Sequence, residues 1–288
     1  MTVLTHALPS VESYVNFFSQ QPLPVLRRTV NTLASLAQKI DDVTRRDVAS
    51  AVLNDPLMTM CLLSHVETNR RKTQNRDIVT INSAIIMMGI IPFFAAFSDI
   101  PTAEDTLASR PKALVGLLRV VARACKAAHY ARNWAVIRHD LDVNEITIAA
   151  LLFEAAEMIC WVNAPDLIQR VFDMQRTDPE LRSSVAQHEV FGITARELQL
   201  ALIRAWRLPK LLIQLLDTTK TEHPRVRTIT LAVDLARHVS RGWDDKALPD
   251  DVSKISALLQ IPPEVLLRNI DAPEESWPVL LPAARQRM

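Results

Sequence analysis

Residues 151–161, with the sequence LLFEAAEMICW, are the stretch that most constrains the fold of this chain. Apolar side chains occupy most of its positions, which predicts a helix buried on several sides at the centre of the core. Glu154 and Glu157 lie one turn apart in this stretch, so a helix would place both on one side. Because carboxylates are rarely buried without partners, the stretch is expected to form either the floor of a functional site or an internal ion pair.

The scarcity of glycine restricts the fold further, since the 288 residues include only four glycines. Hairpin-rich β folds need glycine in their turns, and phosphate-binding loops are built on it. Leucine, alanine and arginine dominate instead, and few segments alternate between apolar and polar residues. These features predict an all-α fold.

Charge and cysteine usage limit the class of partner and the compartment. Lys+Arg of 33 against Asp+Glu of 32 gives a net charge of +1, so no global field attracts nucleic acid or a membrane surface. Cys61, Cys125 and Cys160 are widely spaced in apolar helical contexts, which predicts reduced core thiols. The N-terminus has no signal-peptide pattern, and no apolar run approaches the ~20 residues that span a bilayer. We therefore expect a cytoplasmic protein.

Cap residues and prolines mark where several helices begin and end. Thr44, followed three residues later by Asp47, approximates a capping box. Asp55-Pro56 is expected to start a helix, with proline in its first turn. Thr80 is expected to cap another helix, which Gly89 would end.

Three regions follow from this organisation. Residues 1–20 are predicted to form a tail with a short helix, and residues 21–110 an N-terminal helical lobe. Residues 111–288 are predicted to form a second helical lobe with a C-terminal extension, opening with a long helix from Lys112 to about Ile137. The polar segment Pro101–Arg110 is interpreted as the junction between two packed lobes.

Metal ligation finds little support in the histidines. A helical metal hydrolase needs imidazoles and carboxylates converging from several helices. No two histidines share a spacing that would place them on one helix face. His139-Asp140 are adjacent, but they lie in a polar segment at a helix end, where a solvated charge is the alternative. The seven histidines are His6, His65, His129, His139, His188, His223 and His238.

Two groups of basic residues are candidate contact sites. Arg70, Arg71, Lys72 and Arg76 lie in one polar segment and could contact an anion or an acidic partner, with a solvated loop as the alternative. No aromatic residues are interleaved with them for base stacking. Arg119, Arg123 and Lys126 are spaced i, i+4, i+7 and would line one stripe of the long helix, which is most simply a solvated face.

Short motifs recur along the chain in a fixed order. The first half has residues 22–26 (PLPVL), 47–49 (DVA), 54–58 (NDPLM) and 78–89 (IVTINSAIIMMG). The second half has residues 149–152 (AALL), then Glu197, then residues 202–209 (LIRAWRLP). Over about residues 20–240, this series resembles the HDOD (HD-related output domain) family of bacterial signalling proteins.

The resemblance implies an all-α, HD-domain-like helical fold whose usual role is signalling or regulation without established chemistry. Active HD enzymes carry a His-Asp pair after the "L-L" of the central helix, where this chain has Phe153-Glu154. Phenylalanine cannot ligate a metal. Arg123 or a neighbour stands where an earlier histidine ligand would fall, and Asp234 resembles the one surviving ligand position. The resemblance therefore implies a degenerate metal motif, no catalytic residues, and no cofactor.

A guanidinium could replace the lost metal. Glu154, Asp234 and Glu157 keep acids where a cation was, and Arg123 could pair with them bidentately. The alternative is that Arg123 extends to solvent.

We therefore expect a non-enzymatic signal-transduction or regulatory module that acts through protein–protein contacts. The alternative is a residual metal-dependent phosphohydrolase or nucleotide-binding HD-type domain using Asp234 and Glu154. Nucleic-acid binding through the 70–76 segment and the Arg119 stripe is disfavoured by the neutral net charge, and no membrane partner is expected. Pro92–Pro111 and Arg70–Arg76 are the predicted contact surfaces.

Overall fold

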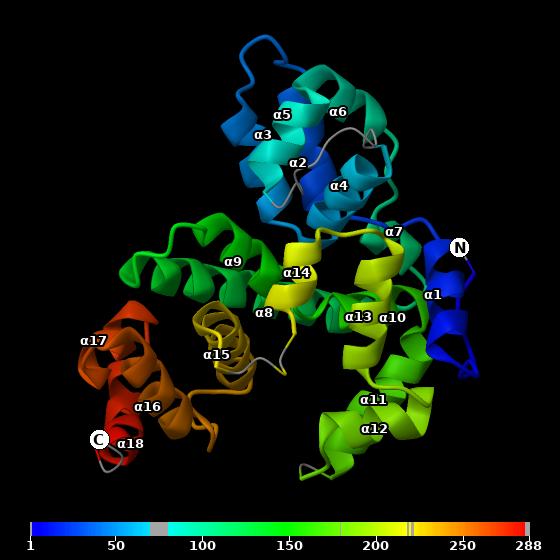
Figure 1. The fold of residues 1–288 in the computed structure, drawn as a ribbon. Coiled ribbons are helices and arrows are strands. Elements are labelled where there is room, and N and C mark those ends of the chain that lie inside the picture. The colour runs from blue at the N-terminus through cyan, green and yellow to red at the C-terminus, as the bar shows by residue number, and fades with distance from the viewer. Residues whose placement is uncertain (1, 70–79, 179, 218, 220–221, 286–288) are drawn as a thin grey trace. The chain divides into compact units, whose positions relative to one another are not determined.

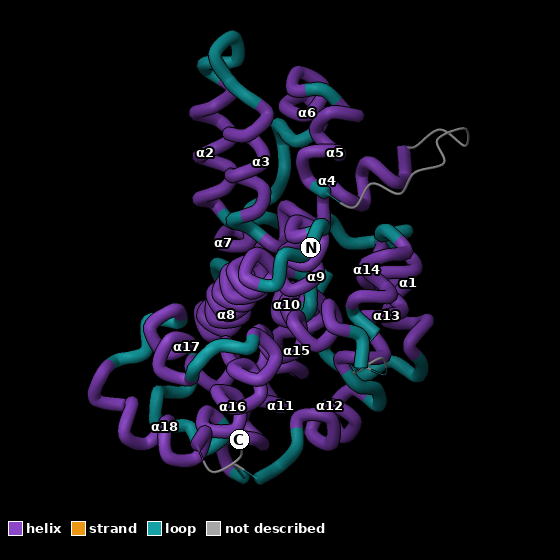
Figure 2. The backbone as a smooth tube through the Cα atoms, turned by 60° about the vertical axis from the view of Figure 1, so that its left-hand side comes forward, coloured by secondary structure: helices purple, strands orange, loops and turns teal. Residues whose placement is uncertain are grey.

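The computed structural model describes residues 2–69, 80–178, 180–217, 219 and 222–285. Every regular element within these ranges is a helix, which confirms the predicted all-α class (Figures 1 and 2). The chain divides into two compact units. Unit 1 comprises Met1–Ala122 and Glu154–Ile213, and unit 2 comprises Arg123–Phe153 and Gln214–Met288. None of the helices in the described ranges combines the length and the apolar character needed to cross a lipid bilayer.

In the described residues of the N-terminal part of unit 1 there are seven helices. They are α1 (Val11–Ser19), α2 (Arg27–Ala37), α3 (Arg45–Leu53), α4 (Pro56–Asn69), α5 (Ile81–Met88), α6 (Ile90–Ala96) and α7 (Ala103–Thr106). Helix α3 packs against α2, α4 and α5. The predicted caps are confirmed: Thr44 and Asp47 form a capping box at α3, Thr80 caps α5, and Gly89 ends α5 with a φ of 85°.

The rest of unit 1 is built from the start of the long helix and from later helices. Helix α8 (Pro111–Ile137) runs through the predicted long-helix segment and continues into unit 2. The helices that follow in unit 1 are α10 (Ala155–Asn163), α11 (Pro165–Thr177), α12 (Ser183–Phe191), α13 (Ala195–Ala205) and the first residues of α14 (Lys210–Leu215). Helix α1 packs on α13, and α10 packs on α11 and α13.

Gly116 of α8 marks a close approach of α8 to α10. A Cβ atom at this position would lie 2.5 Å from Cζ2 of Trp161. Trp161 is buried and also contacts the ring of Phe172, with 5.2 Å between the centroids. Glycine is therefore needed in mid-helix because the indole occupies the space of a side chain.

The central stretch differs from the prediction, because residues 151–161 do not form one continuous helix. Helix α9 ends at Leu151, residues 152–154 form a turn, and α10 begins at Ala155. The amide of Phe153 donates to the carbonyl of Ala150 at 3.4 Å, an i→i−3 bond that tightens the last turn. Burial of the stretch is confirmed, since its apolar residues from Ala155 to Trp161 are all buried.

Unit 2 contains the end of α8, α9 (Val143–Leu151) and the C-terminal helices. The latter are α15 (Pro224–Val239), α16 (Leu248–Leu259), α17 (Pro263–Asn269), the short 3₁₀ helix η1 (Glu274–Ser276) and α18 (Trp277–Arg285). Helix α15 packs against α9 and α16, and α16 packs against α17 and α18. Helical periodicity predicts Ala232, Leu235, Ala236 and Val239 on the buried side of α15. The first three are buried, and Val239 is half-buried.

Two short helices, α6 and α7, precede the long helix α8. Helix α6 begins at Ile90 and has Pro92 in its first turn, where the missing N–H of proline costs no intrahelical hydrogen bond. The segment Pro101–Arg110, interpreted as the junction between lobes, contains α7, which Thr102 caps by accepting a hydrogen bond from the Asp105 amide at 3.1 Å.

Candidate functional site

Unit 1 contains a fully buried carboxylate, that of Asp55, which is 0% exposed. Its Oδ1 accepts hydrogen bonds from the amides of Leu57 (2.9 Å) and Met58 (3.3 Å), so it caps α4. Its Oδ2 accepts from the amide of Leu26 (2.8 Å) and the hydroxyl of Thr29 (2.8 Å). Burial raises the pKa of Asp55, and these four hydrogen bonds oppose that shift.

Asp55 explains why the 22–26 and 54–58 motifs occur together. The extended segment before α2 is held on one side by the Asp55 carboxylate. On the other side, Val25 pairs with the chain before α7: its amide donates to Pro101 O at 2.9 Å, and its carbonyl accepts from the Ala103 amide at 2.8 Å. Both motifs therefore serve the internal structure of unit 1, and no described atom of Asp55 is left for a ligand.

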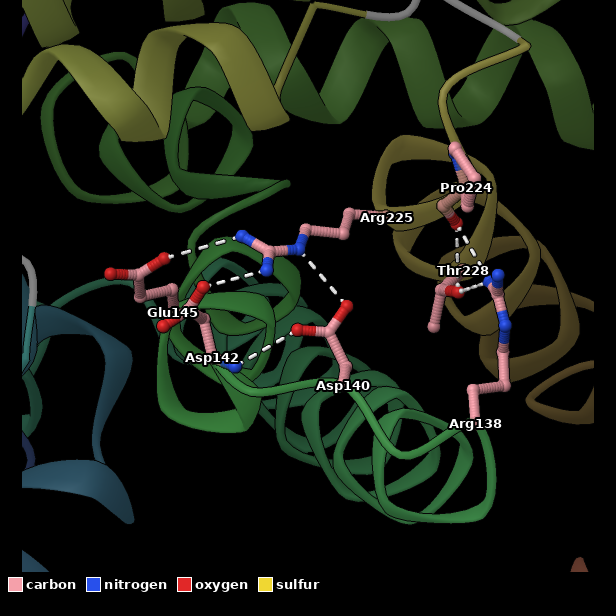
Figure 3. A network of polar contacts seen from close by, with 7 residues as sticks. All are labelled: Arg138, Asp140, Asp142, Glu145, Pro224, Arg225 and Thr228. Atoms are coloured by element: carbon pink, nitrogen blue, oxygen red, sulfur yellow. Dashed lines mark hydrogen bonds and ion pairs between the residues drawn. The ribbon is translucent and has the colours of Figure 1, made fainter.

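In unit 2, Arg225 at the start of α15 joins three carboxylates (Figure 3). Its Nε donates to Asp140 at 2.9 Å and its Nη2 to Asp142 at 2.6 Å, while its Nη1 lies 3.7 Å from Glu145. We call these four residues the Arg225 cluster. The hydrogen bonds to the two aspartates raise the pKa of Arg225 against the effect of burial. Burial, and then the Asp142 charge, raise the pKa of Glu145.

A second arginine ties the end of α8 to the same turn of α15. Nη1 of Arg138 donates to the Pro224 carbonyl at 3.1 Å and to the Thr228 hydroxyl at 2.9 Å (Figure 3). Asp140 is therefore not the simple solvated charge considered from the sequence, whereas His139 next to it is exposed. Arg138 and the Arg225 cluster together attach the α8–α9 connection to α15.

The third polar group lies where α15 packs on α16. Nδ1 of His238 is 2.5 Å from Oδ2 of Asp251, which is buried. This hydrogen bond raises the pKa of His238. Asp234, one turn earlier on α15, has its pKa raised by burial, and the charge of Arg237 opposes this. Nη1 of Arg237 lies 3.5 Å from Oδ1 of Asp234.

The four positions of the predicted degenerate metal motif fall in two units. Phe153, Arg123 and Asp234 belong to unit 2, and Glu154 belongs to unit 1. Phe153 lies half-buried in the turn before α10. Asp234 has Arg237 of its own helix beside it. The pairing of Arg123 with Glu154 or Asp234 stays a prediction.

The two glutamates of the central stretch do not occupy equivalent helical positions. Glu154 is the residue before the first turn of α10, with φ −105° and ψ 23°, and Glu157 lies within that turn. Both are half-buried. Negative charge is stabilised at a helix N-terminus, so the helix end supplies a favourable setting that the sequence did not reveal. Nearby, the amide of Ala156 donates to the side chain of Gln199 at 2.6 Å.

Arg70, Arg71, Lys72 and Arg76 lie outside the described residues. Among the residues that the structure does describe, no group of three or more His, Cys, Asp or Glu side chains is arranged to hold a metal ion. The three cysteines are free thiols, and burial raises the pKa of Cys61 to about 12, which disfavours a nucleophilic thiolate.

Sequence reasoning missed the Arg225 cluster and the His238–Asp251 pair. The partners of Arg225 at Asp140 and Asp142 are 85 and 83 residues away in the chain. His238 and Asp251 are 13 residues apart and lie on different helices. The available signal was weak: three acids within six residues, at 140, 142 and 145, and a proline that places Arg225 in the first turn of a helix.

Comparisons with known proteins place this chain in a family. The model of the HDOD domain matches residues 23–221. No curated protein matches the sequence. A virulence factor from Campylobacter jejuni subsp. jejuni has a similar structure, with a TM-score of 0.64 and 18% identity over 97% of this chain and 100% of that one. The MmoQ response regulator from Methylococcus capsulatus str. Bath has a TM-score of 0.62 and 20% identity over 87% of this chain and 98% of that one.

At these identities the similar structures show the fold alone, and they confirm the predicted HD-domain-like helical fold. The family match covers both halves of the motif series and more than half of the chain. This chain therefore belongs to the HDOD domain family.

Proposed function

We propose that this HDOD protein is a non-enzymatic signal-transduction module that acts through protein–protein contacts. One observation carries the proposal: the position at which the HD pattern has its His-Asp pair holds Phe153-Glu154, in a half-buried turn between α9 and α10. A phenyl ring offers no electron pair to a divalent ion, so the first-row metals that such sites bind lose their imidazole ligand.

The surroundings of Asp234 support the same conclusion. A catalytic divalent ion needs several convergent ligands and an open position for water. Asp234 instead has a guanidinium beside it, that of Arg237 at 3.5 Å. His238, one turn further along α15, is hydrogen-bonded to Asp251. These contacts favour a structural role for the residues near Asp234.

The names of proteins with a similar fold point in the same direction. MmoQ is described as a response regulator, and the Campylobacter protein as a virulence factor. This support is an analogy between folds, since function resides in sites rather than in the fold itself. We place the protein in the cytoplasm, and we keep Pro92–Pro111 and Arg70–Arg76 as proposed contact surfaces.

Affinity capture tests the proposal. The full chain, immobilised through a terminal tag, is incubated with extract of its own cells, and retained proteins are identified by mass spectrometry. An unrelated helical protein of similar size and charge serves as the control. We expect specific, reproducible partners at physiological salt. Retention of none, together with phosphohydrolase activity that copurifies with the chain, would contradict the proposal.

A residual phosphohydrolase is the second candidate. The observation that favours it is the grouping of His238, Asp251 and Asp234 in unit 2. The pKa values of His238 and Asp234 are raised, and groups with perturbed pKa values concentrate at functional sites. Structural ion pairs perturb pKa values in the same way. A measurement of metal bound to the purified chain distinguishes the two functions, because only the phosphohydrolase needs a divalent ion.

A further inference from the structure

The first three turns of α8 expose a mixed basic and apolar surface. Lys112, Val115, Leu118, Arg119 and Ala122 are exposed, and all belong to unit 1. We call them the α8 patch. At 100° per residue they share one side of the helix. The opposite side is buried and consists of Ala113, Leu117, Val120 and Val121.

Among the described residues, the cations of the α8 patch have no acidic ion-pair partner. The sequence contains no aspartate or glutamate from residue 106 to residue 139. No described acidic side chain forms an ion pair with Lys112 or Arg119. An acid one turn away on the same helix can balance such charges, and α8 has none, so within the described part of the chain the positive charge of this face has no ion-pair partner.

Other helices of the same protein show the usual balance. Arg176 pairs with Asp173 in α11 at 3.0 Å, and Lys254 pairs with Asp250 in α16 at 2.6 Å. These pairs join residues three and four positions apart on one helix. The contrast shows that the charge of the α8 patch is a local feature, since the net charge of the whole chain is only +1.

Aliphatic side chains fill the space between the two cations. Val115 is 47% exposed and Leu118 is 39% exposed. Lys112 and Arg119 are seven residues apart, or about 10 Å along the helix at 1.5 Å per residue. The α8 patch therefore presents positive charges two turns apart with apolar surface between them.

We infer that the α8 patch binds an acidic amphipathic helix of a partner protein. A partner helix with carboxylates at i and i+7 has the same pitch, so both acids could meet Lys112 and Arg119 while apolar residues between them cover Val115 and Leu118. Helix-on-helix recognition of this kind reads apolar anchors at i, i+3 and i+7, and charge complementarity sets orientation and partner choice. The inference rests on the proposed function, because it names the chemistry of the protein partner.

Neither nucleic acid nor lipid fits the α8 patch as well. Phosphates would neutralise the cations but leave Val115 and Leu118 without apolar contacts, and the patch has no aromatic side chain for base stacking. A lipid surface gains from side chains that protrude into it, whereas these two are already about half covered by the protein. The two alternatives become outcomes of the test.

Fluorescence anisotropy of a designed peptide tests the inference. The probe is a fluorescein-labelled helical peptide with glutamates at i and i+7 and leucines at i+3 and i+4 between them, titrated with the full chain. A peptide with lysines in place of the glutamates is the matched probe. We expect saturable binding of the acidic peptide only, which weakens as salt increases.

Variants locate the binding site. Arg119→Glu should raise the Kd by about tenfold or more, since it places like charges together, and Leu118→Ser should also weaken binding. Arg170→Glu is the control, because it makes the same charge change at an exposed position of α11 in the same unit. It should bind as the wild type does. Lys112→Glu repeats the test in the first turn of α8, where an acid suits the helix dipole.

The inference is overturned if the acidic peptide does not bind, or if Arg119→Glu and Lys112→Glu bind it as Arg170→Glu does. It is also overturned if duplex DNA or phosphatidylserine vesicles bind the wild type more tightly and lose that binding in Arg119→Glu. Affinity capture with the wild type and Arg119→Glu distinguishes a failure of the α8 patch from a failure of the proposed function. Partners retained equally by the wild type and Arg119→Glu would refute the α8 patch and leave the signalling role intact.

Discussion

Each unit holds its own helices together with a different kind of polar contact. In unit 1, one buried carboxylate, Asp55, accepts four hydrogen bonds from uncharged donors. In unit 2, one partly exposed guanidinium, Arg225, faces the three carboxylates of the Arg225 cluster. Asp55 is 0% exposed, whereas the Arg225 side chain is 26% exposed.

The difference predicts different responses to the solution. A buried anion held by neutral dipoles is shielded from salt, while partly exposed ion pairs weaken as ionic strength increases. The polar contacts of Asp55 in unit 1 should therefore persist over a wide range of salt concentration. The stability of unit 2 should instead change with ionic strength.

Replacing Asp55 should have the largest effect. Asp55→Ala leaves the buried amides of Leu26, Leu57 and Met58 and the Thr29 hydroxyl without their acceptor. We expect a loss of about 3–5 kcal/mol in the free energy of unfolding, since each unsatisfied buried donor costs about 1–3 kcal/mol and the costs are not fully additive. Urea unfolding followed by circular dichroism measures it.

Thr29→Val is the matched control for Asp55. It removes one of the four donors and leaves the three backbone amides in place, so it should cost about 1 kcal/mol. Each variant should lose as much stability in 1 M NaCl as in low salt, even though the Debye length falls to about 3 Å at 1 M. Equal losses from the two variants would show that the carboxylate does not organise unit 1.

Replacing Arg225 should have the next largest effect, and one that salt reduces. Arg225→Met leaves Asp140, Asp142 and Glu145 facing each other without a cation. We expect a loss of about 2 kcal/mol at neutral pH, below the values for fully buried pairs because of solvent screening. Arg225→Lys should lose less, because it keeps the charge but not the planar fork.

The loss of stability in Arg225→Met should also become smaller as the pH falls. The Glu145 pKa is already raised, and protonation of these acids removes the repulsion that Arg225→Met exposes. Urea unfolding at neutral and mildly acidic pH, each at two salt concentrations, measures the trend. A loss that is independent of both pH and salt would mean that the two units do not differ as described.

Gly116→Ala tests the apolar packing of unit 1. Alanine in mid-helix gains about 1 kcal/mol over glycine, but its Cβ would lie 2.5 Å from Trp161. Overpacking costs about 1–3 kcal/mol, so the net effect should be a loss of about 1 kcal/mol. In a Trp161→Leu background the same change should become stabilising, and a stabilising effect in both backgrounds would refute the close packing.

His238 should give the smallest effect, as a pH dependence of unit 2. Its pKa is raised by Asp251, so its contribution is fully present below the unfolded value of 6.5 and is lost as pH rises through the folded value. We expect stability to fall by about 1 kcal/mol between pH 6 and pH 9. His238→Gln should flatten that part of the profile, and an unchanged profile would contradict the assignment.

Local chemistry made much of the fold predictable from the sequence. The caps at Thr44 and Thr80 act within three residues, so their hydroxyl spacing is visible in the chain. The Asp55-Pro56 helix start was predictable for the same reason. That Asp55 also binds Leu26 was not, because this contact spans 29 residues and depends on how α2 meets α4.

The candidate site was less predictable for a related reason. Apolar periodicity indicated that residues 151–161 are buried, and their apolar residues other than Phe153 are, but it could not locate the turn at 152–154. The turn differs from a continuous helix in that the amide of Phe153 donates to the carbonyl three residues earlier, at Ala150, and not four residues earlier. The Arg225 cluster needed the fold itself, since polar residues at helix ends carry no periodic signal.

Metal content of the purified chain tests the central claim most directly. The wild type and Asp234→Ala are incubated with Mn²⁺, Fe²⁺, Ni²⁺ or Zn²⁺ and dialysed, and bound metal per chain is measured by mass spectrometry. A signalling module that lacks the His-Asp pair should retain far less than one ion per chain, with no difference between the two proteins. One ion per chain in the wild type, lost in Asp234→Ala, would contradict the account and favour the phosphohydrolase.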